Sequence, residues 1–503
     1  MLTGSARSSW ADDPPAAAAP GDAAAGDAPD NKALADQVRA LQQEVDQLKK
    51  AATPPEGTPQ EQPRKGQTDT EHTNGKLAEP AAKPSGPPPL TWMGVTVYGV
   101  VDLSIAHLTH GAPLSNTYPA SLPFVLQSFS NHPITSIADN GLSQSRLGLS
   151  GIEPLHILDI KAVFRLETAF QPTSGRLSDG PRSLVDNNGV PLAKRITSGD
   201  SARAGQPLQS AAYVGLSSTT YGTATFGRQN TLMSDALLKY DPQLQSQTFS
   251  PISYSGTSAG FGDTEDKTLD ISAKYVLTYG PFHVAGMYQF GRHGYEPEGY
   301  YGGAIGFEYA GLSIDAVAGK VKGAIAAASL NATQAAAAPG TLAGTISDNT
   351  GFAVLGLYTL KPFRFYASYE HIVYDNPENP LPAGTVTIGS YVLSVVNNAA
   401  YNIKRKLDYF WAGARYAVLP QLELSLGYYL FFQNSYNANG CTDDSAGSCS
   451  GTFHDVSFVA DYRLSPRFDT YAGFNYTTGS DGLVAGFLNT SDLATVAGIR
   501  FTF

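Results

Sequence analysis

The sequence is poor in charged residues, methionine and cysteine for its length. Charged residues make up 15% of the 503 residues, and there are four Met and two Cys. No apolar run approaches the 18 or more residues of a membrane-spanning helix, which excludes a helical membrane protein. The formal net charge of −11 argues against binding to nucleic acid. There is no phosphate-binding loop, no His-Glu-x-x-His and no Gly-x-Ser-x-Gly, so the sequence predicts no enzyme, no metal and no cofactor.

The two cysteines lie close together in a segment rich in Gly, Ser and Asp. Cys441 and Cys449 flank the residues Thr-Asp-Asp-Ser-Ala-Gly-Ser. A close pair in a polar loop predicts a disulfide formed in an oxidising compartment. Metal binding is the alternative interpretation, and it is the weaker one because no histidine is near the two thiols.

Two segments at opposite ends of the chain alternate between apolar and polar residues. In Val95–Leu108, one face carries Val, Gly, Leu and Ile, and the other carries Thr96, Tyr98, Val100, Asp102 and Ser104. A half-buried strand of a soluble sandwich has the same pattern, so this segment alone does not decide the fold. The segment Leu493–Phe503 also alternates, and the chain stops at an aromatic residue. Two such strands can pair with each other and abolish both sheet edges, which predicts a closed barrel.

Between these two segments the chain consists of further alternating segments. The sequence predicts sixteen strands, near 95–108, 142–152, 156–170, 208–218, 221–229, 266–279, 281–291, 300–310, 312–323, 350–361, 362–374, 403–418, 421–434, 452–464, 467–479 and 493–503. Short turns such as Lys361-Pro362 alternate with long connections at 109–141, 171–207, 230–265, 324–349 and 375–402. This alternation, with an even strand count, is typical of an outer-membrane β-barrel. A soluble β-propeller would instead repeat a blade of constant length, and no such repeat is present.

The first ninety residues have a different composition. Residues 1–30 are mainly Ala, Pro, Gly and Asp and are predicted to be disordered; they lack the apolar core of a signal peptide, although Ser8–Ala11 is compatible with a cleavage-site remnant. Export is therefore inferred from the barrel. In 31–50 a heptad pattern predicts a coiled coil, whose core residues are Leu34, Val38, Leu41, Val45 and Leu48. The alternative is a lone amphipathic surface helix. Residues 51–90 form a Pro-rich linker, so 91–503 is the predicted barrel domain.

Charged residues on predicted strands share a face that is opposite to apolar residues. Arg146 lies opposite Leu147 and Leu149, and Arg165 and Glu167 lie opposite Phe164 and Leu166. Opposite charges are costly in a dry core but are natural in a water-filled pore. The pattern therefore indicates that the polar face lines a lumen and that the apolar face meets lipid.

At these residues the sequence resembles the trimeric general porins of Gram-negative outer membranes, especially the β-proteobacterial branch. The similar segments are spread along the barrel in family order: 97–102, 145–153, 164–167, 212–216, 221–229 and the terminal Phe503. About ninety N-terminal residues lie outside the resemblance. The resemblance implies a sixteen-stranded barrel that assembles as a homotrimer.

The resemblance also implies a constricted pore. In that family the third long loop folds into the lumen, and acids on the loop face arginines on the wall. Residues 230–265 are similar to this loop, and Asp241 and Asp235 would carry its acidic side. Arg146, Arg228 and Glu167 fall on family wall positions. Ser210 and Gln245 depart from the family pattern, and Arg165 on the same lumen face would restore the missing charge.

The sequence therefore predicts an outer-membrane porin for passive diffusion of small hydrophilic solutes and ions, filtered by charge at the constriction. The predicted partners are two further copies of the chain, outer-membrane lipid and lipopolysaccharide, and peptidoglycan through a periplasmic N-terminal segment. The alternative function is a substrate-selective porin for anionic metabolites or sugars. An adhesin with a barrel anchor is disfavoured because the predicted loops are too short to form an external domain.

Overall fold

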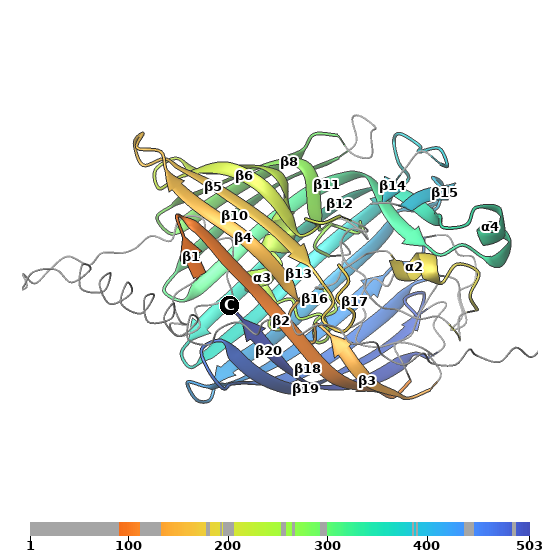
Figure 1. The fold of residues 1–503 in the computed structure, drawn as a ribbon. Helices are drawn as coiled ribbons and strands as arrows, with labels where there is room; N and C mark the ends of the chain where they lie inside the picture. Colours follow the sequence, from red (N-terminus) through yellow and green to blue (C-terminus); the bar gives the residue numbers. More distant parts are fainter. Residues whose placement is uncertain are drawn as a thin grey trace, which may run out of the picture. The chain divides into compact units, whose positions relative to one another are not determined.

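In the computed structural model, antiparallel pairing joins the strands of the barrel wall into one closed sheet (Figure 1). The structure describes residues 90–110, 132–177, 182–191, 194, 206–252, 258–263, 267–291, 299–384, 387–388, 391–436, 447–484 and 489–503. Its strands are β1 (Leu90–Trp92), β2 (Val95–Leu108), β3 (Ile134–Asp139), β4 (Arg146–Pro154), β5 (Lys161–Ala169), β6 (Ala211–Ser218), β7 (Gly222–Asn230), β8 (Thr268–Tyr279), β9 (Phe282–Gln289), β10 (Tyr300–Tyr309), β11 (Leu312–Ala328), β12 (Leu342–Leu360), β13 (Phe363–Asp375), β14 (Thr387–Ile388), β15 (Tyr391–Asn397), β16 (Arg405–Ala417), β17 (Leu422–Gln433), β18 (Gly451–Arg463), β19 (Phe468–Asp481) and β20 (Ser491–Thr502). The helices are α2 (Arg182–Asp186), α3 (Leu232–Tyr240) and α4 (Ala332–Ala337).

These strands form the sixteen staves of the barrel wall, which confirms the predicted sixteen-stranded antiparallel barrel. β3 and β4 pair with the upper and lower parts of the same edge of β2 and count as one stave. The short β1 adds to the other edge of β2, and β14 and β15 form a hairpin beside the start of β12. Every remaining strand pairs antiparallel with its neighbour along the chain.

The barrel closes where β2 pairs with β20, as the two terminal segments predict. The register runs from Val100 opposite Thr502 to Leu108 opposite Ala494. Beyond it, Gly99 N donates to Phe503 O at 2.9 Å, and Phe503 N donates to Gly99 O at 3.1 Å. A Cβ at Gly99 would lie 2.5 Å from the ring of Phe503, so the closing aromatic residue requires a glycine beneath it.

The two faces of the sheet have opposite chemistry. Along β2, Asp102, Ser104, Ala106 and Leu108 are buried inside the barrel, whereas Ile105 is 61% exposed on the outside. The other strands expose a similar outer band that includes Leu147, Leu149, Val214, Leu216, Phe226, Ile305, Phe352, Val354, Phe410, Leu426 and Ile499. An apolar band around a barrel with a polar interior is the surface expected in contact with lipid.

We expect Arg at Leu149 to cost the barrel about 2–4 kcal/mol near the membrane midplane, because this side chain points into lipid. Arg at the neighbouring Ser150, which pairs with Arg165 on the lumen side, should be tolerated far better. Refolding yield into lipid vesicles, read as the gel shift between folded and heated protein, measures both. A barrel that forms with Leu149→Arg but not with Ser150→Arg would show that the faces are reversed.

The connections differ at the two rims. Two-residue turns such as 310–311 and 361–362 lie at one end, and α2, α4 and the β14–β15 hairpin lie at the other (Figure 1). Part of the predicted long connections is sheet: β3 lies within 109–141, and β11 and β12 extend into 324–349 as a hairpin. Ile325, Leu342 and Ile346 of this hairpin pack on Leu184 of α2 and Leu393 of β15.

No helix within the described parts of the chain is long and apolar enough to cross a membrane. The predicted disordered segment, the heptad at 31–50 and the linker up to residue 89 lie outside the described residues. The heptad core positions Leu34, Val38, Leu41, Val45 and Leu48 therefore stay a prediction.

Candidate functional site in the barrel lumen

The chain between β7 and β8 lies inside the barrel. It begins with α3, whose N-cap Thr231 accepts a hydrogen bond from Ser234 N at 2.9 Å. The apolar face of α3, with Met233, Leu237 and Tyr240 fully buried, packs against the inner wall formed by β9 to β13. Further along, Ser246 Oγ donates to Gly141 O at 2.9 Å, on the far side of the lumen at the β3–β4 break. The described parts of this inner loop, residues 231–252, 258–263 and 267, therefore cross the lumen and narrow it.

Asp241 fixes the inner loop at the end of α3. Its carboxylate is fully buried and accepts hydrogen bonds from Gln243 N at 3.0 Å, Gln245 N at 2.8 Å and Tyr429 Oη of β17 at 2.5 Å. Burial raises the pKa of Asp241, and the bond from Tyr429 opposes that rise. The contacts of Asp241 are thus with its own loop and with the wall at β17, so this residue acts as an anchor.

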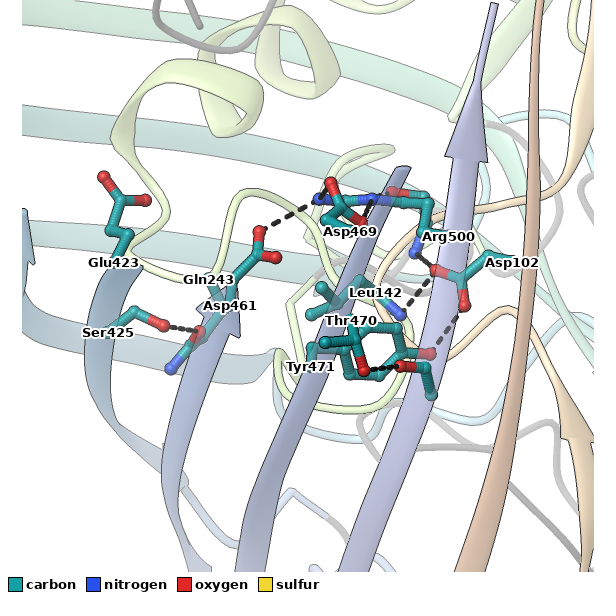
Figure 2. Close-up of polar contacts among 12 residues, drawn as sticks. Asp102, Leu142, Gln243, Glu423, Ser425, Asp461, Asp469, Thr470, Tyr471 and Arg500 are labelled. Carbon is teal, nitrogen blue, oxygen red and sulfur yellow. Dashed lines mark hydrogen bonds and ion pairs between the residues drawn. The ribbon is translucent and has the colours of Figure 1, made fainter. Parts of the chain in front are cut away.

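The backbone on either side of Asp241 is tied to the same wall. Trp411 Nε1 donates to Tyr240 O at 3.0 Å, and Arg415 Nη1 donates to Pro242 O at 2.8 Å. Ser425 Oγ donates to Gln243 Oε1 at 2.8 Å (Figure 2). A loop held by side-chain bonds at successive residues has few alternative positions.

Asp235, the other predicted loop acid, also has a partner. Its carboxylate pairs with Lys274 Nζ of β8 at 2.6 Å and accepts from Asn230 Nδ2 at 3.2 Å. Lys274 is 2% exposed at its side chain, so this is a buried pair in the first turn of α3. The position also favours a carboxylate, because the helix dipole is positive there.

The wall formed by β2, β4 and β5 carries the predicted charge cluster. Arg165 Nη2 pairs with Glu167 Oε2 at 2.5 Å, and Arg146 Nε lies 3.6 Å from the same oxygen. Tyr98 Oη of β2 donates to this oxygen at 2.9 Å, and the Arg165 guanidinium lies 5.1 Å from the ring centre of Tyr98. Register explains the assembly, because Gly148 pairs with Glu167 and a Cβ there would meet the Tyr98 ring at 2.2 Å.

The contacts of Arg228 are with residues outside this cluster. Its side chain is buried and donates to Gln209 O at 2.6 Å and Thr268 O at 2.9 Å, and it pairs with Asp270 Oδ1 at 2.8 Å. The bonds to Thr268 and Asp270 join β7 to β8 at the bulge after Gly227, and the bond to Gln209 joins β7 to the segment before β6. Of the six predicted constriction residues, the structure therefore brings Arg146, Arg165 and Glu167 together and gives Arg228, Asp235 and Asp241 partners of their own.

The sequence reasoning missed three residues of the lumen. The alternation along their strands places Tyr98 and Tyr429 on the lumen face. Nothing in the sequence identifies the carboxylate to which each one donates a hydrogen bond. Lys267 lies at the end of the inner loop, and its carbonyl accepts a hydrogen bond from Thr231 N at 3.0 Å, which joins the two ends of the loop. Gln245 donates from Nε2 to Ser234 O at 2.9 Å, so this departure from the family pattern stabilises the loop with a neutral side chain.

The sequence also predicts a disulfide between Cys441 and Cys449 and no metal site. Cys449 is 2% exposed, and Cys441 lies outside the described residues, so the predicted disulfide stays a prediction. Within the part of the chain that the structure describes, no group of three or more His, Cys, Asp or Glu side chains could hold a metal ion.

A closed sixteen-stranded barrel with an apolar outer band and a lumen narrowed by an inner loop defines an outer-membrane channel. The family model of the Gram-negative porins matches residues 77–482, and the chain belongs to this family. Family and fold together point to a channel rather than to an enzyme.

Solved porin structures share the fold at low sequence identity. The anion-selective porin from Comamonas acidovorans aligns with a TM-score of 0.54 and 17% identity, over 81% of this chain and 99% of that chain. The trimer form of OmpT, an outer-membrane protein of Vibrio cholerae, aligns with a TM-score of 0.51 and 16% identity, over 81% and 99%. A search of curated proteins finds no match.

Proposed function

We propose that this porin is a general-diffusion channel for small hydrophilic solutes and ions, with charge filtering at the constriction. The observation that supports it best is the inner loop, which narrows the lumen opposite the wall that carries Arg146, Arg165 and Glu167. A passive channel of this kind limits solute size by the width of the constriction and discriminates by the field across it. On this proposal the wall cluster is the positive side of the filter, because two guanidinium groups share one carboxylate.

A substrate-selective porin for anionic metabolites or sugars is the second candidate. The excess of cations in the wall cluster favours it, since a carboxylate or phosphate group entering the lumen would meet two arginines. Current that saturates at micromolar solute would support this candidate over general diffusion.

The assembly that we propose is a homotrimer in outer-membrane lipid and lipopolysaccharide. The family and the existence of a trimer form of the similar Vibrio cholerae protein support it.

We place the N-terminal segment in the periplasm because β1 and the terminal Phe503 both lie at the short-turn rim (Figure 1). There, residues 31–50 would form a parallel three-stranded coiled coil that contacts peptidoglycan. Cys441 and Cys449 would form a disulfide at the opposite rim.

Replacing Arg146 and Arg165 together by Ser should widen the constriction and shift the channel towards cations, because Glu167 then remains without its two guanidinium partners. The reversal potential across a planar bilayer in a KCl gradient measures the shift. Arg182→Ser on α2, which breaks an exposed pair with Asp186 away from the wall, serves as the matched control. An unchanged reversal potential in the double variant would remove the wall cluster from the filter.

A further inference from the structure

Two connections meet at the rim opposite the short turns. The first is the rim strap, residues 182–191, which comprises α2 and the turn after it and belongs to the connection between β5 and β6. The second is the rim hairpin, residues 324–347, formed by the end of β11 and the start of β12. In the wall, the four staves β7 to β10 lie between β6 and β11 (Figure 1). The contact between strap and hairpin therefore joins parts of the rim that are not neighbours in the sheet.

Buried hydrogen bonds hold the rim strap to the rim hairpin. Asn188 Oδ1 accepts from Leu330 N at 2.7 Å, and Asn188 Nδ2 donates to Thr341 O at 2.7 Å, so one side chain binds both arms of the hairpin. Ser329 Oγ donates to Leu184 O of α2 at 2.8 Å. Leu184, Ser329 and Leu330 are all buried. The strap is thus bound by specific contacts rather than resting on the surface of the hairpin.

The same pair of strands holds the second half of the inner loop. Asp263 Oδ2 accepts a hydrogen bond from Ile325 N of the rim hairpin at 3.1 Å. Asn349 Nδ2 of β12 donates to Phe261 O at 2.9 Å, and a Cβ at Gly351 would lie 2.2 Å from the ring of Phe261. Phe261 and Asp263 are fully buried. The inner loop therefore has a second anchor, separate from the one at the end of α3.

Ile325 belongs to both sets of contacts. Its backbone N–H binds the inner loop, and its buried side chain packs in one cluster with Leu184 of the strap. The hairpin leaves the wall at a shift in register between Val321 and Ala324, where Gly323 has a φ of 66°. A bulge of this kind interrupts the ladder and bends the strand. The direction of the hairpin beyond the bulge is thus fixed in part by its packing on the strap and on β15.

We propose that the rim strap positions the inner loop through the rim hairpin, and that Asn188, at the rim, helps to set the width of the constriction. With the strap bound, Ile325 holds Asp263 in place. With the strap released, the hairpin can tilt at the bulge, and the end of the inner loop moves with it. Asn188 is a positioning residue, because it acts through the hairpin. The inference rests on the proposed diffusion function and adds to it a contact that controls the constriction from the rim.

The test records single channels in planar bilayers for the wild type, Asn188→Ala, and Asn188→Ala combined with Ser329→Ala. In the double variant the time spent at conductance levels other than the wild-type level should rise about ten-fold, the effect of one to two net hydrogen bonds. Asn188→Asp keeps the acceptor for Leu330 N and should give an intermediate result. Thr333→Ala changes an exposed side chain of α4 in the same hairpin and should give the wild-type recording.

A double-mutant cycle with Asp263→Ala shows whether the effect passes through the hairpin. Asp263→Ala alone should also add conductance levels. Combining it with the two strap substitutions should change little more, because the link to the hairpin is already broken. Effects that simply add would overturn the route through Ile325.

The outcomes separate this inference from the function on which it rests. Strap variants with wild-type recordings would overturn the role of Asn188 while leaving a conducting porin. Folded wild-type barrels that carry no current would overturn the proposed function itself. The gel shift on heating confirms that each variant is folded before it is recorded, and Asn188→Ala alone carries the comparison if the double variant does not fold.

Discussion

Replacing Arg500 by Ala should destabilise the closed barrel by about 3–5 kcal/mol, the usual cost of leaving buried charges without their partner. Arg500 lies on β20, the closing strand, and its side chain is 13% exposed. It pairs with both oxygens of Asp469 at 3.0 Å and with Asp461 Oδ2 at 3.0 Å, and it donates to Ser143 Oγ at 2.9 Å (Figure 2). Its cross-strand partner in β2 is Asp102. Without the guanidinium, three carboxylates remain close together at the seam.

The carboxylate of Asp102 also joins several segments at the seam between β2 and β20. It accepts hydrogen bonds from Leu142 N at 2.9 Å, Ser143 N at 2.7 Å and Tyr471 Oη at 2.5 Å (Figure 2). These bonds join β2 to the β3–β4 break and, across β20, to β19. Loss of Arg500 should therefore loosen the one strand pair that makes the sheet a closed barrel.

Urea unfolding of the barrel in lipid vesicles measures the loss of stability. Arg500→Lys, which keeps one positive charge, should lose less than Arg500→Ala, and Arg500→Ala combined with Asp469→Asn should recover part of the loss. An Arg500→Ala barrel within about 1 kcal/mol of the wild type would mean that water in the lumen solvates the acids as well as the guanidinium does.

The staves were predictable because a barrel strand has two environments that alternate with a period of two. Val95–Leu108 was predicted as a strand with these same bounds, and each of the other fifteen predicted segments overlaps a stave. β3 was missed because its six residues are followed by Asn140-Gly141, a turn signal that in fact marks a break within one stave. The extension of β11 was missed because its Ala-rich end has low strand propensity and is stabilised by packing on α2 and β15.

The candidate site was predictable only to the level of which face each residue occupies. Parity placed Arg146, Arg165 and Glu167 on the lumen side, and the structure shows their shared contacts. The alternation of side chains along a strand does not apply to a loop, so it could not place Asp241. The partner of this residue, Tyr429, lies 188 positions further along the chain.

Replacing Asp241 by Ala should release the inner loop from the wall while leaving the barrel closed. The change leaves two backbone N–H groups and the hydroxyl of Tyr429 without their acceptor. Each buried donor without an acceptor costs about 1–3 kcal/mol. This cost falls on the docking of the loop, because the bonds of Asp241 are to its own loop and one wall residue, and the strand pairs do not depend on them. Single-channel recordings should therefore change from a steady conductance to switching between several levels. The gel shift between folded and heated protein should stay unchanged, because the barrel remains folded. Asp241→Asn keeps one acceptor oxygen and should give an intermediate result. Asp186→Ala, which changes an exposed side chain of α2, should give the wild-type recording. A steady, wild-type conductance in Asp241→Ala would show that the side-chain bonds from Trp411 and Arg415 to the loop backbone hold the loop without this carboxylate.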